Sequence, residues 1–201
     1  MNVILDVSEF QSLGQLDHLL RNADDEVIAV YIKATQGLAY SDSMADAFAA
    51  VCLAHNTPFG YYDFMTNDQA SSQAMSFKDF IASLRHKPSR RPMTDAEGAY
   101  NKYAAGITNW ENAFGTVPLI YAPLSMMPKY ASMPNRKWVA QYDSMSYYRP
   151  AQSEINAYAS QGYAAWQFTS NYCGLNQDAS ILLGDMGALM MPSPLALKDD
   201  D

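Results

Sequence analysis

The sequence predicts an α/β protein in which about eight strands close into a barrel. The chain has 201 residues, of which 49% are hydrophobic and 17% are charged, enough to bury one large core in one domain. Short runs rich in β-branched and aromatic residues alternate with longer segments of helical period, the pattern of parallel βα units. About eight such runs occur, a number that favours a closed barrel over an open sheet.

The first half of the chain alternates strands and helices regularly. Its first helix follows from the helical spacing of Leu13, Leu16 and Leu19. Pro58 lies just after the second helix, and the third is expected to point its apolar side chains, Met75 among them, toward the core. The predicted strands are Val3–Leu5 (ending on Asp6), Glu26–Lys33, Phe59–Phe64 and Met93–Glu97; the predicted helices are Leu13–Leu20, Asp42–His55 and Asp68–Arg85; a turn is expected over Thr35–Gly37.

The second half of the chain is expected to be irregular, because its strands follow one another with little helix between them. β-Branched and aromatic runs again mark the strands. The predicted strands are Val117–Tyr121, Trp138–Tyr142, Tyr163–Phe168 and a possible last strand at Asp178–Leu183; the predicted helices are Tyr100–Phe114 and Pro150–Ser160.

Composition and charge exclude several classes of function. A net charge of −8 and a pI of about 4.7 argue against nucleic acid as a partner, since no basic stripe is present to neutralise phosphates. No apolar run approaches the ~18 residues of a membrane span, and the first residues lack the features of a signal peptide. Cys52 is expected to be a small core residue without a disulfide to Cys173. The three histidines have no ligand spacing, so neither a metal nor a cofactor is expected.

Two carboxylates, Asp95 and Glu97, stand two residues apart where a short strand is predicted to end. In an extended chain such side chains share one face and lie about 6.5–7 Å apart. Acids this close repel each other, so one tends to keep its proton near neutral pH while the other ionises. That pair suits general acid catalysis on a glycosidic bond. The alternative is a solvated strand end, because Asp-x-Glu is common by chance.

Other acids and aromatic residues also follow predicted strands. In a parallel barrel, chemistry takes place at the carboxyl ends of the strands, so these side chains are expected to meet in one cleft. Carboxylates and aromatic rings together suit a carbohydrate, whose C–H faces stack on rings and whose hydroxyls need polar partners. The alternative is that most of the aromatic residues only pack in the core. The set comprises Asp6, Asp63, Asp95, Glu97, Tyr62, Tyr121, Tyr142 and Trp166.

Six short motifs, in order along residues 3 to 185, resemble glycoside hydrolase family 25, the muramidases that include many phage endolysins. They are Asp6-Val7-Ser8 with Gln11; Ile32-Lys33-Ala34-Thr35 with Gly37; Gly60, Tyr62 and Phe64; Asp95-Ala96-Glu97; Trp138-Val139-Ala140-Gln141-Tyr142; and Trp166-Gln167-Phe168-Thr169-Ser170. Asp178 also stands where the family has a further cleft aspartate.

The resemblance implies a flattened, irregular (β/α)5(β)3 TIM-like barrel over residues 1–190, the catalytic domain, with a tail or linker start at residues 191–201. It implies cleavage of the β-1,4 bond between N-acetylmuramic acid and N-acetylglucosamine in bacterial peptidoglycan. Glu97 looks like the proton donor, with Asp95 assisting and Asp6 as a supporting catalytic acid. The residues assigned to substrate binding are Asp178, Tyr62, Asp63, Tyr121, Gln141, Tyr142, Trp166 and Gln11.

Three residues depart from the family pattern: Gln36 replaces Glu, Asp63 replaces His and Phe168 replaces a common Tyr. Asp63 is expected to add negative charge to the cleft and raise the pKa of neighbouring carboxyls. These departures motivate a second hypothesis, that the protein is a wall-glycan-binding or structural phage protein with weakened catalysis. A third is a glycosidase acting on another N-acetylated sugar, such as chitin.

The expected biology follows from the resemblance and the missing signal peptide. The protein would be a monomeric phage lysin that is made in the cytoplasm, does not insert into membranes, and acts on the cell wall after a holin releases it.

Overall fold

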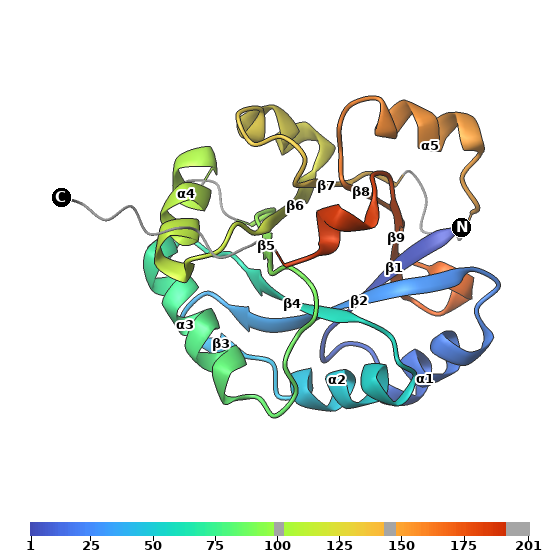
Figure 1. The fold of residues 1–201 in the computed structure, drawn as a ribbon, viewed down its shortest axis with the longest axis horizontal. Coiled ribbons are helices and arrows are strands. Elements are labelled where there is room, and N and C mark those ends of the chain that lie inside the picture. The colour runs from blue at the N-terminus through green and yellow to red at the C-terminus, as the bar shows by residue number, and fades with distance from the viewer. Residues whose placement is uncertain (99–102, 143–147, 192–201) are drawn as a thin grey trace.

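The computed structural model describes residues 1–98, 103–142 and 148–191, which form one closed barrel with helices around it (Figure 1). Eight strands follow the order β1-β9-β8-β7-β6-β5-β4-β2, and pairing of β1 with β2 closes the ring. The ninth, β3, pairs antiparallel with the last two residues of β2. The strands are β1 Asn2–Val7, β2 Glu26–Gln36, β3 Tyr40–Ser41, β4 Phe59–Phe64, β5 Met93–Asp95, β6 Leu119–Pro123, β7 Lys137–Ala140, β8 Ala165–Thr169 and β9 Asp178–Leu182.

The helices explain why the two halves of the chain differ. Helices α1 to α4 each follow a barrel strand, namely β1, β2, β4 and β5, whereas β6 is followed only by a 3-10 segment. All barrel pairings are parallel except those of β9, which runs antiparallel to both β8 and β1. The predicted irregular α/β barrel is therefore confirmed. The helices are α1 Leu13–Asn22, α2 Ala45–Ala54, α3 Ala70–Ser83, α4 Tyr103–Phe114 and α5 Gln152–Ala159, with 3-10 segments η1 Leu124–Tyr130, η2 Tyr172–Gly174 and η3 Met186–Leu189.

Alternate residues of each strand build two separate cores, as the period of two requires. The outer core lies between barrel and helices and includes Phe77 of α3 and Trp110 of α4. The inner core fills the barrel. Gly60 of β4 belongs to this side, because a Cβ there would lie 2.8 Å from the ring of Tyr31. The inner core consists of Ile4, Ala29, Tyr31, Tyr62, Met93, Leu119, Trp138, Ala164, Ala165 and Leu189.

Several predicted boundaries shift. Strand β2 continues to Gln36, two residues into the predicted turn, because β3 and β4 both pair with its end. Strand β5 stops at Asp95, which leaves Glu97 in the loop beyond it. Met75 was predicted to face the core but is 45% exposed on α3. The predicted start of a helix at Tyr100 and most of the predicted tail lie outside the described residues.

Two other expectations can be compared directly with the structure. Cys52 is buried and Cys173 is exposed, and both are free thiols. Among the described residues, no helix has the length and apolar character needed to cross a membrane.

Candidate active site

A cavity of about 180 Å³ opens at the carboxyl ends of the barrel strands. It brings together six of the predicted site residues, from strands β1, β4, β5, β6 and β9 and the loop after β5. The described residues of its lining are Asp6, Ser8, Phe10, Lys33, Tyr62, Phe64, Met93, Asp95, Glu97, Tyr121 and Asp178.

Three of the four carboxylates in the described lining lie on barrel strands, and Glu97 follows β5. Asp95 is the last residue of β5, and its carboxylate accepts the backbone N–H of Glu97 at 3.3 Å. Asp6 and Asp178 are register partners across β1 and β9. The antiparallel last strand therefore brings an acid from the end of the chain beside one from its start.

Burial dominates the electrostatics of these acids. It raises the pKa of Asp6 and of Asp95 well above the usual value, and it raises the pKa of Glu97. Burial, followed by the charge of Glu97, raises the pKa of Asp178 to about 6. Repulsion adds to the effect at Asp6, first from Asp178 and then from Asp95. A cluster of this kind holds protons near neutral pH, as a general acid must.

Lys33 is a cation in this lining that the sequence reasoning did not assign to the site. It is 8% exposed, and its ammonium donates to Gln36 Oε1 at 2.7 Å and lies 4.9 Å from the ring centre of Phe64. Its charge lowers the pKa of Asp95 and of Glu97, against the larger effect of burial. Lys33 was visible in the sequence as a charge within an otherwise apolar strand, which indicates a partner or a function.

A chain of hydrogen bonds links Tyr121 to Asp178. The Tyr121 hydroxyl donates to Gln167 Oε1, and the Gln167 amide donates to the Asp178 carboxylate at 2.8 Å. Burial raises the pKa of Tyr121 and of Tyr62 well above the usual value, so both hydroxyls remain protonated donors. Gln167 belongs to one of the six sequence motifs but was not predicted to be a site residue.

Two predicted binding residues do not reach the cavity. Asp63 points outward from β4 and is fully buried, where it accepts hydrogen bonds from Thr35 Oγ1 at 2.7 Å and Trp110 Nε1 at 3.1 Å. Trp166 also lies in the outer core, stacked on Tyr158 with ring centres 4.1 Å apart. Both predictions placed the side chain on the wrong face of its strand, because strand period alone does not say which face is inner.

Three other predicted residues lie around the cavity without forming its lining. Tyr142 follows β7 and is partly exposed, and its pKa is raised by burial and then by the charge of Asp178. The Gln141 backbone carbonyl accepts a hydrogen bond from the Trp166 indole at 2.7 Å. Gln11 braces its own loop through Ser8.

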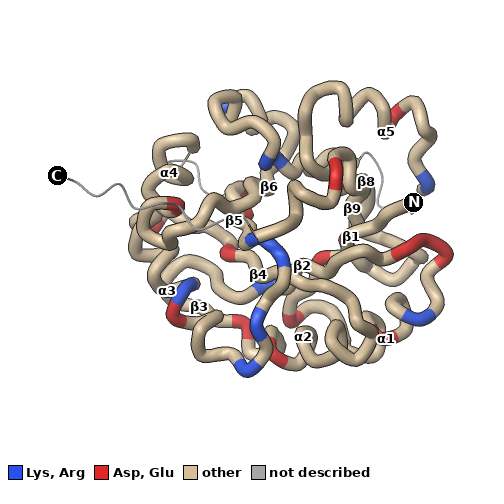
Figure 2. Tube along the Cα trace, viewed as in Figure 1, with Lys and Arg blue, Asp and Glu red and all other residues tan. Residues whose placement is uncertain are grey.

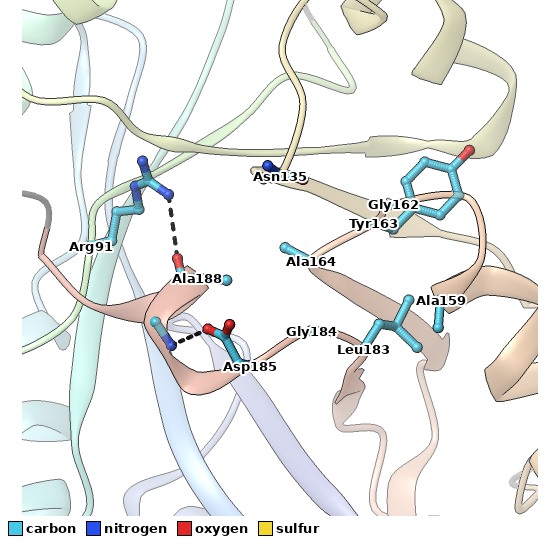
Figure 3. Close-up of a pocket in the computed structure, with 11 residues that line it drawn as sticks. Arg91, Asn135, Ala159, Gly162, Tyr163, Ala164, Leu183, Gly184, Asp185 and Ala188 are labelled. Atoms are coloured by element: carbon cyan, nitrogen blue, oxygen red, sulfur yellow. Dashed lines mark hydrogen bonds between the residues drawn. The ribbon is translucent and has the colours of Figure 1, made fainter.

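A larger cavity, of about 450 Å³, opens at the opposite, amino end of the strands (Figure 3). Its two charged lining residues are already engaged with the backbone. Arg91 donates from Nε to the carbonyl of Val117 at 2.7 Å, and Asp185 accepts the N–H of Gly187 at 2.7 Å. Lys and Arg also gather along the segment between α3 and β5 that leads to this end (Figure 2). This cavity has no cluster of acids among its described lining residues.

Acids with raised pKa values at the carboxyl ends of a β/α barrel, one of them next to a second carboxyl group, are the arrangement that glycoside hydrolases use for general acid catalysis. Among the described residues, no group of three or more His, Cys, Asp or Glu side chains is arranged to hold a metal ion.

The sequence pattern of Glycosyl hydrolases family 25 matches residues 5–174, so the chain belongs to this family. Solved structures confirm the fold. A muramidase from Acremonium alcalophilum is 20% identical, with 93% of this chain and 96% of that chain covered and a TM-score of 0.63. A family GH25 lysozyme from Aspergillus fumigatus is 21% identical, with 92% and 95% covered and a TM-score of 0.64. No curated protein sequence matches the chain.

About half of a modular endolysin is similar as well. The Cpl-1 endolysin, solved with a peptidoglycan analogue, is 18% identical, and the alignment covers 92% of this chain and 54% of that chain with a TM-score of 0.62.

Proposed function

We propose that the protein is a peptidoglycan hydrolase that cleaves the β-1,4 bond between N-acetylmuramic acid and N-acetylglucosamine. The observation that carries the proposal is the cluster of one buried acid, Asp95, and three half-buried acids, Asp6, Glu97 and Asp178, in one cavity at the carboxyl ends of the strands. Membership of Glycosyl hydrolases family 25 supports the reaction class. The names of the similar structures, muramidase and lysozyme, and the peptidoglycan analogue bound to one of them support the substrate.

In this proposal, protonated Glu97 is the general acid. It gives its proton to the glycosidic oxygen as the bond from that oxygen to the anomeric carbon breaks. Burial keeps this proton on Glu97 at pH values where a solvated Glu would have lost it.

Asp95 acts from the same side of the bond, because it adjoins Glu97 and accepts its backbone N–H. A carboxylate in that position stabilises positive charge on the sugar or holds the substrate's N-acetyl group while the acetyl oxygen attacks the anomeric carbon. This arrangement suits substrate-assisted hydrolysis, an exception to the scheme in which two acids flank the sugar. Water then opens the intermediate and completes hydrolysis.

We further propose that the enzyme acts as a phage lysin, reaching the cell wall after its release from the cytoplasm. The resemblance to the Cpl-1 endolysin supports this role. The intact acid cluster favours the enzyme over a glycan-binding protein, because binding a neutral sugar does not require several buried carboxylates.

Product analysis tests the proposal. Purified peptidoglycan is digested, and the new reducing ends are reduced with borohydride and identified after acid hydrolysis. The proposal predicts reduced muramic acid. Reduced glucosamine instead would make the enzyme a glucosaminidase, and no new reducing ends on any wall tested would exclude hydrolysis.

A further inference from the structure

Phe10 is the most exposed large hydrophobic side chain among the described residues, at 78%, and it lines the same cavity as Glu97. A single exposed apolar residue is ordinary on a protein surface and needs no explanation by itself. Its position at the mouth of an acidic cavity, and the loop that carries it, make Phe10 a different case.

The loop between β1 and α1 is held on both sides of Phe10. Before it, the backbone N–H of Glu9 donates to the Asp42 carboxylate at 2.9 Å. After it, the N–H of Gln11 donates to the carbonyl of Ser8 at 2.9 Å, and the Gln11 side chain accepts the N–H of Ser8 at 2.9 Å. Ser12 then caps α1. The bare ring is therefore presented from a braced turn and not from a free loop.

A braced aromatic ring beside polar groups is a preorganised binding surface. The loop backbone is already ordered and a Phe side chain has only two torsions to fix, so little conformational entropy is lost when a ligand contacts the ring. The apolar C–H face of a pyranose ring matches the π-face of Phe, while the sugar's hydroxyls can reach the nearby carboxylates Asp6 and Glu97.

We propose that Phe10 is a stacking platform for a sugar ring of the glycan strand, in a subsite next to the bond that is cleaved. This assignment rests on the proposed function and names a binding residue for it. Phe10 contributes affinity that is equal in the ground state and the transition state, because the ring carries no charge or proton for the reaction.

The experiment uses soluble peptidoglycan oligosaccharides, two to four disaccharide repeats long, prepared without stem peptides. Phe10→Ala is expected to raise KM about 5- to 20-fold with kcat within twofold of wild type, the effect of losing one ring stack. Phe10→Trp and Phe10→Tyr keep a flat face and should retain the wild-type KM. Phe10→Leu keeps apolar area without the flat face and should resemble Phe10→Ala.

Leu53→Ala is the matched control. Leu53 is 49% exposed on α2 and is not part of the cavity lining, so KM should not change. Phe10→Ala should also leave the melting temperature within about 2 °C, because an exposed ring adds little to the core.

The outcomes separate this inference from the proposed function. If wild type cleaves and Phe10→Ala has an unchanged KM, the platform is wrong and the hydrolase stands. An equal KM for Phe10→Leu and wild type would also overturn stacking. An effect seen only on strands that carry stem peptides would move the contact to the peptide and contradict the sugar assignment. If wild type does not cleave, calorimetry measures binding of the same oligosaccharides instead. Loss of binding in Phe10→Ala but not in Leu53→Ala would support the stacking role of Phe10 without the proposed hydrolysis, and equal binding by Phe10→Ala and wild type would overturn it.

Discussion

The two ends of the barrel differ in a way that cavity size does not reveal. The amino end holds the larger cavity, about 450 Å³ against about 180 Å³. The charged side chains in its described lining, Arg91 and Asp185, form hydrogen bonds with backbone groups. The carboxyl end holds four carboxylates whose burial raises their pKa. The desolvated acids, and not the volume, distinguish the end that can do chemistry.

Parallel strands explain the difference. The loop after each strand leaves from the carboxyl end, so the last residue of a strand and the next two can point into the same space. Asp95 and Glu97 use this placement directly. Burying acids that have no counter-charge lowers the free energy of unfolding. Such acids are retained where they have a function.

The largest expected effect comes from exchanging one acid at each end. Glu97→Gln removes the proposed general acid and should reduce kcat by about 10²- to 10⁴-fold. Asp185→Asn is the matched control at the amino end, where an amide oxygen can still accept the N–H of Gly187. It should retain wild-type activity. Release of new reducing ends from purified peptidoglycan measures both, and similar losses in the two variants would remove the functional distinction between the ends.

A second comparison uses two lysines that each lie over an aromatic ring. Lys33 is at the carboxyl end, 4.9 Å from the ring centre of Phe64, and Lys137 is near the amino end, 5.3 Å from that of Tyr163. Lys33 lowers the pKa of Glu97 and Asp95, so Lys33→Met should raise both. Because the reaction needs Glu97 protonated and a neighbour ionised, both limbs of the pH profile should move to higher pH. Lys137→Met should leave the profile in place; an unmoved profile for Lys33→Met would refute the role of its charge.

The smallest effect on activity is expected at Asp63, in the outer core. Asp63→Asn should leave kcat/KM within about threefold, because this side chain does not line the cavity. The amide can donate to the Thr35 hydroxyl and still accept from Trp110, as the protonated acid does. A hundredfold loss of kcat/KM would instead show that Asp63 takes part in the reaction.

Stability should respond to Asp63→Asn more than activity does. Burial raises the pKa of Asp63 from 3.8 in the unfolded chain to about 7 in the folded protein. The folded state therefore holds the proton more tightly, and this stabilisation is fully present below about pH 4 and is lost as the pH rises through about 7. The variant has no such loss and should be more stable than wild type by roughly 4 kcal/mol at pH 8. Denaturant unfolding at pH 4 and pH 8 measures the difference, which should be absent at the lower pH.

Local patterns in the sequence predicted most of the fold. The alternating runs located all eight barrel strands, and the strand at Phe59–Phe64 has its predicted bounds. Strand ends also predicted that Asp6, Asp95 and Glu97 would meet, because the ends of parallel strands lie at one rim. Elements that form only through tertiary pairing were not predicted. An example is the short strand β3, which is a strand because it pairs with the end of β2.

The sequence by itself determined the number of barrel strands, their alternation with helices and the presence of an acid pair at a strand end. Only the tertiary structure decided which face of each strand is inner. That choice buried Asp63 and Trp166 behind the barrel wall and brought Lys33 to the cavity, whereas the loop between β1 and α1 placed Phe10 there. The physical reason is that side chains alternate with a period of two, so the pattern fixes which residues share a face, while the face that turns inward depends on how all eight strands close.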